Sequence, residues 1–183
     1  MLAGVLASAV FVSFFLTKAP EAQAVATGDY QTHQTGDWNN TATWERWNGS
    51  SWVTPAPSTP VSTDGVITVL SSHTVTATAA VTADQVVVNS GGQVTINSGR
   101  TLTIANGAGV DLQVNGILAN AGDLTMQASS EVRVSGTVSV SGTGGFSMGS
   151  SSVALYFDSG STLSWNRNGG TLPPVAKTFW DSN

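Results

Sequence analysis

Residues 86–116, with the sequence VVVNSGGQVTINSGRTLTIANGAGVDLQVNG, decide the fold. The stretch is a series of short units, each an alternation of apolar and polar residues that ends in Asn, Ser or Gly. Alternation turns Val, Leu and Ile to one face of a strand and Thr or Gln to the other. Asn-Gly and Ser-Gly pairs supply the positive φ that tight corners need. The pattern predicts short strands and tight turns, with a period of about eight residues.

Similar units run, less regularly, from residue 65 to the Leu163–Trp165 segment. One unit cannot bury its own apolar face, so successive coils must stack on one another. Two or three units per coil predict an all-β solenoid with roughly 16 to 25 residues in each coil. A β-sandwich is the alternative, because its strands recur at a similar spacing. The candidate core residues are Val87, Ile96, Ile104, Val114, Val134 and Val140.

The Asn residues of these units allow two interpretations. They could stack as a ladder inside one corner, or they could be ordinary turn residues at the surface. The ladder requires a spacing that matches one full coil. The residues concerned include Asn89, Asn97, Asn106 and Asn115.

The composition excludes several classes of protein. Charged residues make up 9% of the chain against a typical ~25%, whereas hydrophobic residues make up 40%, enough to form a core. The net charge is -5 and no basic patch is visible, so the sequence does not indicate a nucleic-acid binder. Cysteine is absent, which excludes a disulfide or a thiolate site and favours an exported bacterial protein over a small eukaryotic secreted domain.

The N-terminal segment has the features of an export signal. Residues 2–16 form an apolar run shorter than a membrane-spanning helix, and Ala22-Gln23-Ala24 fits the pattern that signal peptidase reads. Cleavage there predicts a mature chain that starts at Val25 and is secreted or held at the cell surface. No Lys or Arg precedes the run, so retention as an apolar helix, as in a pilin-like subunit, is the alternative; only then would the protein contact a membrane.

Between this segment and the repeats lies a stretch rich in Trp and Pro. Its tryptophans allow two interpretations: a hydrophobic lid over the first coil, or a platform on which sugar rings stack. The residues concerned are Trp38, Trp44, Trp47 and Trp52.

The same stretch resembles a known group of proteins. The sequence GDWNNTATW at residues 36–44, a Pro-rich link, DGVITV at 64–69 and SHTV at 72–75 look like the start of secreted bacterial surface proteins. They are similar to the extracellular domain family named for its eight glycines, over about residues 36–122. The resemblance implies a right-handed parallel β-helix in a surface or carbohydrate-facing protein. The expected organisation is a signal peptide or retained helix at 1–24, a Trp/Pro-rich cap and linker at 25–64, and solenoid repeats with an open C-terminal end at 65–183.

Catalytic signatures are sparse. The two histidines, His33 and His73, have no zinc-binding spacing, and G-x-S-x-G is absent. Glu131 and Arg133 share a strand face, where a surface ion pair is the simplest interpretation. We therefore expect no enzyme activity, no catalytic or metal site and no cofactor. The only candidates for glycan cleavage are Asp111, Asp123, Glu131 and Arg133.

Two functions remain for this sequence. The first is an extracellular structural protein, a subunit or spacer of a cell-surface or filamentous assembly that associates head to tail. The second is a carbohydrate-binding or adhesive module of a larger exported protein, with a cell-surface polysaccharide as partner. The residues expected to contact another copy or a glycan are Trp38, Trp44, Trp47, Trp52, Trp165, Phe179 and Trp180.

Overall fold

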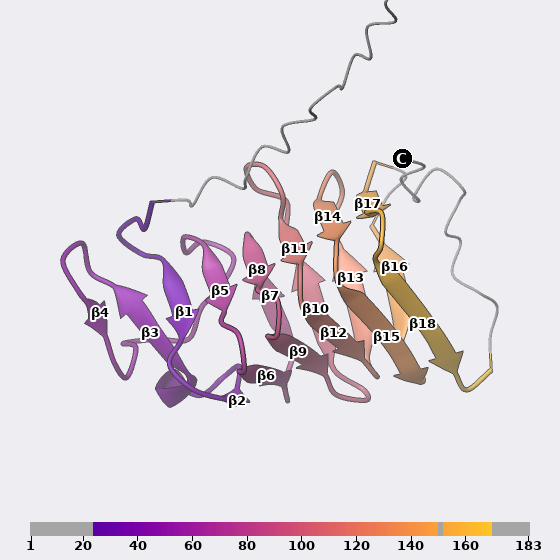
Figure 1. Ribbon diagram of the computed structural model, residues 1–183, viewed down its shortest axis with the longest axis horizontal. Helices are drawn as coiled ribbons and strands as arrows, with labels where there is room; N and C mark the ends of the chain where they lie inside the picture. The colour runs from indigo at the N-terminus through magenta and orange to yellow at the C-terminus, as the bar shows by residue number, and fades with distance from the viewer. Residues whose placement is uncertain (1–23, 150–151, 170–183) are drawn as a thin grey trace, which may run out of the picture.

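The computed structural model describes residues 24–149 and 152–169, and the chain forms a β-solenoid of about four turns (Figure 1). Three sheets run along it, and successive coils contribute one parallel strand to each. Among the described residues the only helix is a 3-10 turn, η1 (Thr41–Thr43). This arrangement confirms the predicted all-β solenoid over the sandwich alternative.

The first sheet, sheet A, contains the strands that open each coil. Its members are β1 (Tyr30–Thr32), β3 (Trp44–Trp47), β4 (Trp52–Val53), β5 (Ile67–Val69), β8 (Val86–Val88), β11 (Leu112–Val114), β14 (Glu131–Val134) and β17 (Ala154–Phe157). Sheet B contains β2 (Gly36–Asp37), β6 (Thr74–Ala77), β9 (Gln93–Ile96), β12 (Ile117–Asn120), β15 (Thr137–Gly142) and β18 (Thr162–Arg167). Sheet C contains β7 (Val81–Ala83), β10 (Thr101–Ile104), β13 (Asp123–Met126) and β16 (Gly145–Met148).

The register gives the length of each coil. Ile67 pairs with Val86, 19 residues further along the chain, and Val86 pairs with Leu112, 26 residues further along. The longer coil lies just outside the predicted range because residues 105–111 form an excursion between β10 and β11. Each coil therefore holds three of the short units seen in the sequence.

The core runs along the inside of the solenoid and consists mainly of Val, Leu and Ile. Five of the six candidate core residues are buried, which confirms them: Ile96, Ile104, Val114, Val134 and Val140. The prediction for Val87 is wrong, because β8 turns its two flanking valines inward and leaves Val87 half-buried on the outer face. Three consecutive valines carry no alternation, so only the register with Thr68 and Gln113 assigns the face.

The corners use glycine in two ways. Gly91 and Gly99 have φ of 80° and 68°, the left-handed conformation expected of tight turns. Gly116 lies where successive coils approach closely, and a Cβ there would overlap the carbonyl oxygen of Gly92. The side chain is excluded at such a corner by the coil next to it.

The Asn residues of the units are turn residues rather than a ladder. Asn97, Asn106 and Asn115 are exposed and Asn89 is half-buried. The buried amide is instead Asn120, whose Nδ2 donates to the carbonyl oxygen of Gly145.

The N-terminal end of the solenoid carries an added hairpin on sheet A. β1 and β2 pair in parallel with β5 and β6, so stacked coils begin within the segment predicted to be cap and linker. On its other side β1 pairs with β3, and β3 pairs with β4. Both pairings are antiparallel, so β3 and β4 form a hairpin at the end of sheet A (Figure 1).

Two tryptophans fill the core beneath this end. Trp38 and Trp44 are 1% and 0% exposed, with ring centroids 5.1 Å apart. The indole N–H of Trp38 donates to the carbonyl oxygen of Pro60, and that of Trp44 donates to the carbonyl oxygen of Trp38. The lid interpretation therefore holds for these two residues, because neither can reach a glycan or a second chain.

No helix in the described part of the chain has the length and apolar character to cross a membrane. The predicted export signal at residues 2–16 lies outside that part, as do Phe179 and Trp180.

Candidate binding surface at the N-terminal end

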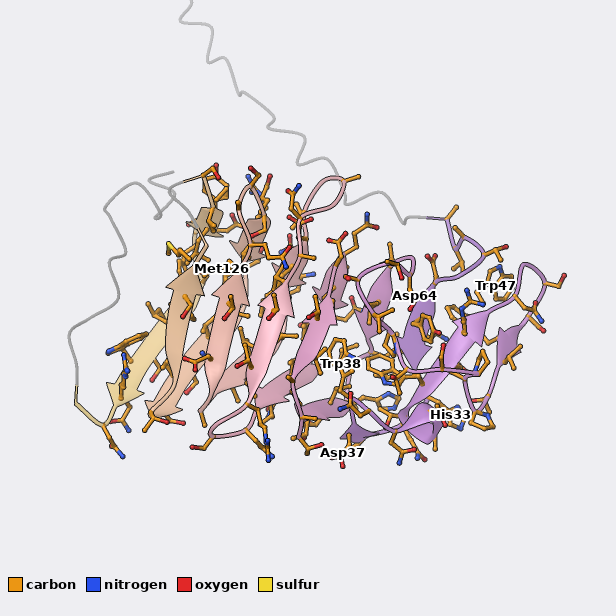
Figure 2. The ribbon with its side chains drawn as sticks, turned by 180° about the vertical axis from the view of Figure 1, so that it is seen from behind. His33, Asp37, Trp38, Trp47, Asp64 and Met126 are labelled. Carbon is orange, nitrogen blue, oxygen red and sulfur yellow. The ribbon has the colours of Figure 1, made fainter. Side chains whose placement is uncertain are left out.

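The outer face of β1, β3 and β4 gathers polar and aromatic side chains. Residues two apart on a strand, and residues directly opposite on neighbouring strands, point to the same face. Gln31 pairs with Glu45, and Trp47 pairs with Trp52. Since His33 lies two residues beyond Gln31, all five side chains belong to one face. Figure 2 shows Trp47 and His33 within this N-terminal end of the molecule.

Trp47 and Trp52 are both half-buried, and their ring centroids are 5.4 Å apart at an interplanar angle of 62°. The edge-to-face geometry is the one that aromatic pairs prefer. The four N-terminal tryptophans thus divide into a buried pair in the core and an outer pair on the hairpin.

Glu45 occupies the centre of this face. Its Oε1 accepts a hydrogen bond from Gln31 Nε2, and its Oε2 lies 3.6 Å from Nδ1 of His33. The Glu45 side chain is 16% exposed and that of His33 is 48% exposed. The carboxylate is therefore fixed by its neighbours while part of it faces solvent.

A surface hollow of about 240 Å³ lies at the η1 end of the same three strands. Ligand pockets for drug-sized molecules usually start at ~300 Å³, so the hollow suits a smaller unit. Its lining residues are His33, Gln34, Ala42, Thr54 and Pro55.

The remaining predicted contact residue within the described chain is Trp165 on β18. It is half-buried at an inward-facing position beside Val140, and its ring centroid lies 5.7 Å from that of Phe146. Trp165 thus covers the core at the last coil rather than standing free on the surface.

The four candidate residues for glycan cleavage do not converge on one site. Asp111 is buried in a corner, and Asp123 is exposed on sheet C. Glu131 and Arg133 form the predicted surface ion pair at 2.9 Å, and Arg133 also contacts Asp158 at 3.3 Å. The hydrogen bond that Arg133 Nε donates to Glu131 raises the pKa of Arg133.

A carboxyl pair that the sequence did not reveal lies at the corner before β8 and β11. Asp84, 8% exposed, shares a hydrogen bond with the fully buried Asp111. Burial, together with this hydrogen bond and the charge of Asp111, raises the pKa of Asp84 to about 6. Asp111 Oδ1 accepts from the backbone N–H of Gly107, and Oδ2 from that of Glu131 in the next coil. Both oxygens of Asp111 accept from backbone amides, and one of these amides belongs to the next coil. The carboxyl pair therefore links neighbouring coils.

Within residues 24–149 and 152–169, no three His, Asp or Glu side chains gather as they would around a metal ion. His73 instead shares a hydrogen bond with Thr32, between Nδ1 and Oγ1. Comparison with protein families, with curated proteins and with solved structures finds no match for this chain.

Proposed function

We propose that the protein is an extracellular structural protein, a rigid subunit or spacer of a cell-surface or filamentous assembly, secreted or held at the cell surface. Continuous parallel sheets and a single core support this role, because each coil is hydrogen-bonded to the next and packs on it through the shared core. The outer faces carry mainly Thr, Ser and Gln, which suits prolonged contact with water. The described residues hold no converging catalytic cluster that would favour an enzyme.

The observation that carries the proposal is the difference between the two ends. At the N-terminal end an antiparallel hairpin extends sheet A, two tryptophans are buried, and the outermost strands β4, β2 and β7 are only two or three residues long. At the other end, among the described residues, β16, β17 and β18 each pair with a strand on one side only. Unpaired strand edges are templates for pairing with another chain. The last coil is therefore the expected point of attachment.

The lengths of the edge strands bear on the geometry of self-association. Head-to-tail stacking would bring the last coil against β4 and β2, whose edges are two residues long, and against the three-residue β7. The edges at the last coil are four to six residues long. Short edges disfavour strand addition. We therefore expect two last coils to meet in preference to the head-to-tail contact that the sequence suggests. This contact would give a closed pair, which serves as a spacer, whereas head-to-tail contact would give a filament.

The test is sedimentation of residues 25–183 with one lysine placed at each end. Ser164→Lys changes an exposed residue of β18, and Val53→Lys changes an exposed residue of β4. A lysine on an edge strand opposes pairing there. Loss of association in Ser164→Lys alone places the contact between last coils, whereas loss in both variants indicates head-to-tail stacking. A wild-type chain that stays monomeric at high concentration and forms no fibres by electron microscopy contradicts the proposal.

A further inference from the structure

The outer tryptophan pair is not required to fill the core. Trp38 and Trp44 already do so, and both have hydrogen-bond acceptors for their indole N–H groups. Trp47 and Trp52 keep part of their rings in solvent, and within the described residues neither indole N–H has an acceptor. Half-exposed tryptophans offer an apolar ring face and a free donor, a combination enriched at binding surfaces.

Glu45 supplies the complementary polar group beside these rings. It lies two residues from Trp47 on β3, a separation of about 6.6 Å on the same face. An ionised carboxylate accepts hydrogen bonds at both oxygens, and Glu45 accepts one from Gln31 at Oε1 while its Oε2 lies 3.6 Å from His33 Nδ1. Since these neighbours hold the side chain in place, little conformational freedom is lost when a further hydroxyl donates to it.

The hollow continues the same surface beyond Glu45. Thr54 lies two residues past Trp52, so its side chain follows that of Trp52 along the hairpin, and it lines the hollow together with His33. Aromatic faces, a fixed acceptor and a small hollow thus follow one another at intervals comparable with a sugar ring. This succession suits a chain of linked sugars better than one compact molecule.

The charge on this face selects among polysaccharides. Glu45 is the acidic group of the surface, and the protein carries a net charge of -5. Arg46 is on the opposite face of β3, with its guanidinium 5.7 Å from the centroid of the Tyr30 ring, and so offers no cation here. The carboxylate of Glu45 would repel an acidic polysaccharide, because no fixed cation on this face offsets its charge. A neutral or amino-sugar chain carries no negative charge and would not be repelled.

We propose that the outer face of β1, β3 and β4 binds a neutral or amino-sugar polysaccharide, with sugar rings against Trp47 and Trp52 and a sugar hydroxyl donating to Glu45. Sugars whose hydroxyls are equatorial have apolar ring faces, so β-linked glucose-type chains are the expected class. This binding is independent of the proposed self-association, because it uses the opposite end of the solenoid.

The experiment is a pull-down of the purified chain, residues 25–183, with insoluble cellulose and chitin, and with immobilised polygalacturonate as the acidic probe. The test variants are Trp47→Ala, Trp52→Ala and Glu45→Gln. The matched control is Val53→Ser, which changes an exposed residue on the other face of the same hairpin. Thermal unfolding of each variant checks that the hairpin is intact, and Trp47→Phe keeps an aromatic ring if the alanine variant fails to fold.

We expect cellulose or chitin to retain the wild type and Val53→Ser, with at least tenfold weaker binding for Trp47→Ala and Trp52→Ala. Weaker binding by Glu45→Gln supports the role of the carboxylate. Unchanged binding would show that the carboxylate does not take part in binding. Failure of both cellulose and chitin to retain the wild type overturns the proposal, as does equal retention of the folded tryptophan variants. Preferential retention by polygalacturonate overturns the assignment of sugar class.

Discussion

The substitution Asp84→Asn should stabilise the protein at neutral pH and have little effect near pH 4. Asp84 shares a hydrogen bond with Asp111 at a buried corner, and its pKa is raised from 3.8 to about 6. A raised carboxyl pKa means that the folded state favours the protonated form. The stabilisation from that proton is complete below the unfolded pKa and is lost as the pH rises through about 6.

The size of the effect follows from the shift. Each pKa unit corresponds to about 1.4 kcal/mol, so ionised Asp84 costs the folded state up to about 3 kcal/mol above pH 7. Asparagine has no charge to bury, its Nδ2 can donate to Asp111, and its Oδ1 can accept from the backbone N–H of Gln85 as the aspartate does. In a domain of this size the gain corresponds to a rise in melting temperature of roughly 6–12 °C.

Urea unfolding of wild type and Asp84→Asn at pH 4, 5, 6 and 7.5 measures the difference directly. The exposed Asp123 on β13 provides the matched control, because Asp123→Asn removes a carboxylate of the same size from a solvated position. We expect the stability difference for Asp84→Asn to grow between pH 4 and pH 7. A difference that is constant with pH, or destabilisation at pH 7.5, would refute the carboxyl pair as the source of the shift.

Five further substitutions test the corners and the core. Asp111→Asn should destabilise the protein by about 1–3 kcal/mol in urea unfolding, because one of two part-buried backbone N–H groups loses its acceptor. Gly116→Ala should cost more free energy of unfolding than Gly99→Ala, since a Cβ meets a neighbouring carbonyl at Gly116 and nothing within 4 Å at Gly99; equal losses would contradict the close-approach argument. Ile96→Ala should destabilise by about 2–5 kcal/mol and Val87→Ala by much less, because only Ile96 lies inside the solenoid; a larger effect at Val87 would mean that the register of β8 is wrong.

Alternation alone was enough to predict the strands and most of the core. Where apolar and polar residues alternate, as at Thr101–Ile104, the inward face can be assigned without the structure. At Val86–Val88 every residue is apolar, and the assignment needs the neighbouring coils. The coils differ in length, 19 residues in one and 26 in the next, so the sequence has no fixed period from which the register could be predicted.

The functional surface could be predicted only in part, because composition does not separate a buried tryptophan from an exposed one. Trp44 and Trp47 lie on the same strand, three residues apart, and therefore point to opposite faces. That difference was accessible only once β3 was known to be a strand. Asp84 was missed because its partner Asp111 belongs to the following coil, and only stacking brings the two together.

Hydrogen exchange as a function of protein concentration tests the unequal ends most directly. We predict that amides of β1 are protected at every concentration, because β3 covers one edge and β5 the other. Amides of β18 that point away from β15 should exchange rapidly in dilute solution and become protected as concentration rises. Protection that rises at β4 with concentration, or β18 amides that stay unchanged while the protein associates, would contradict attachment at the last coil.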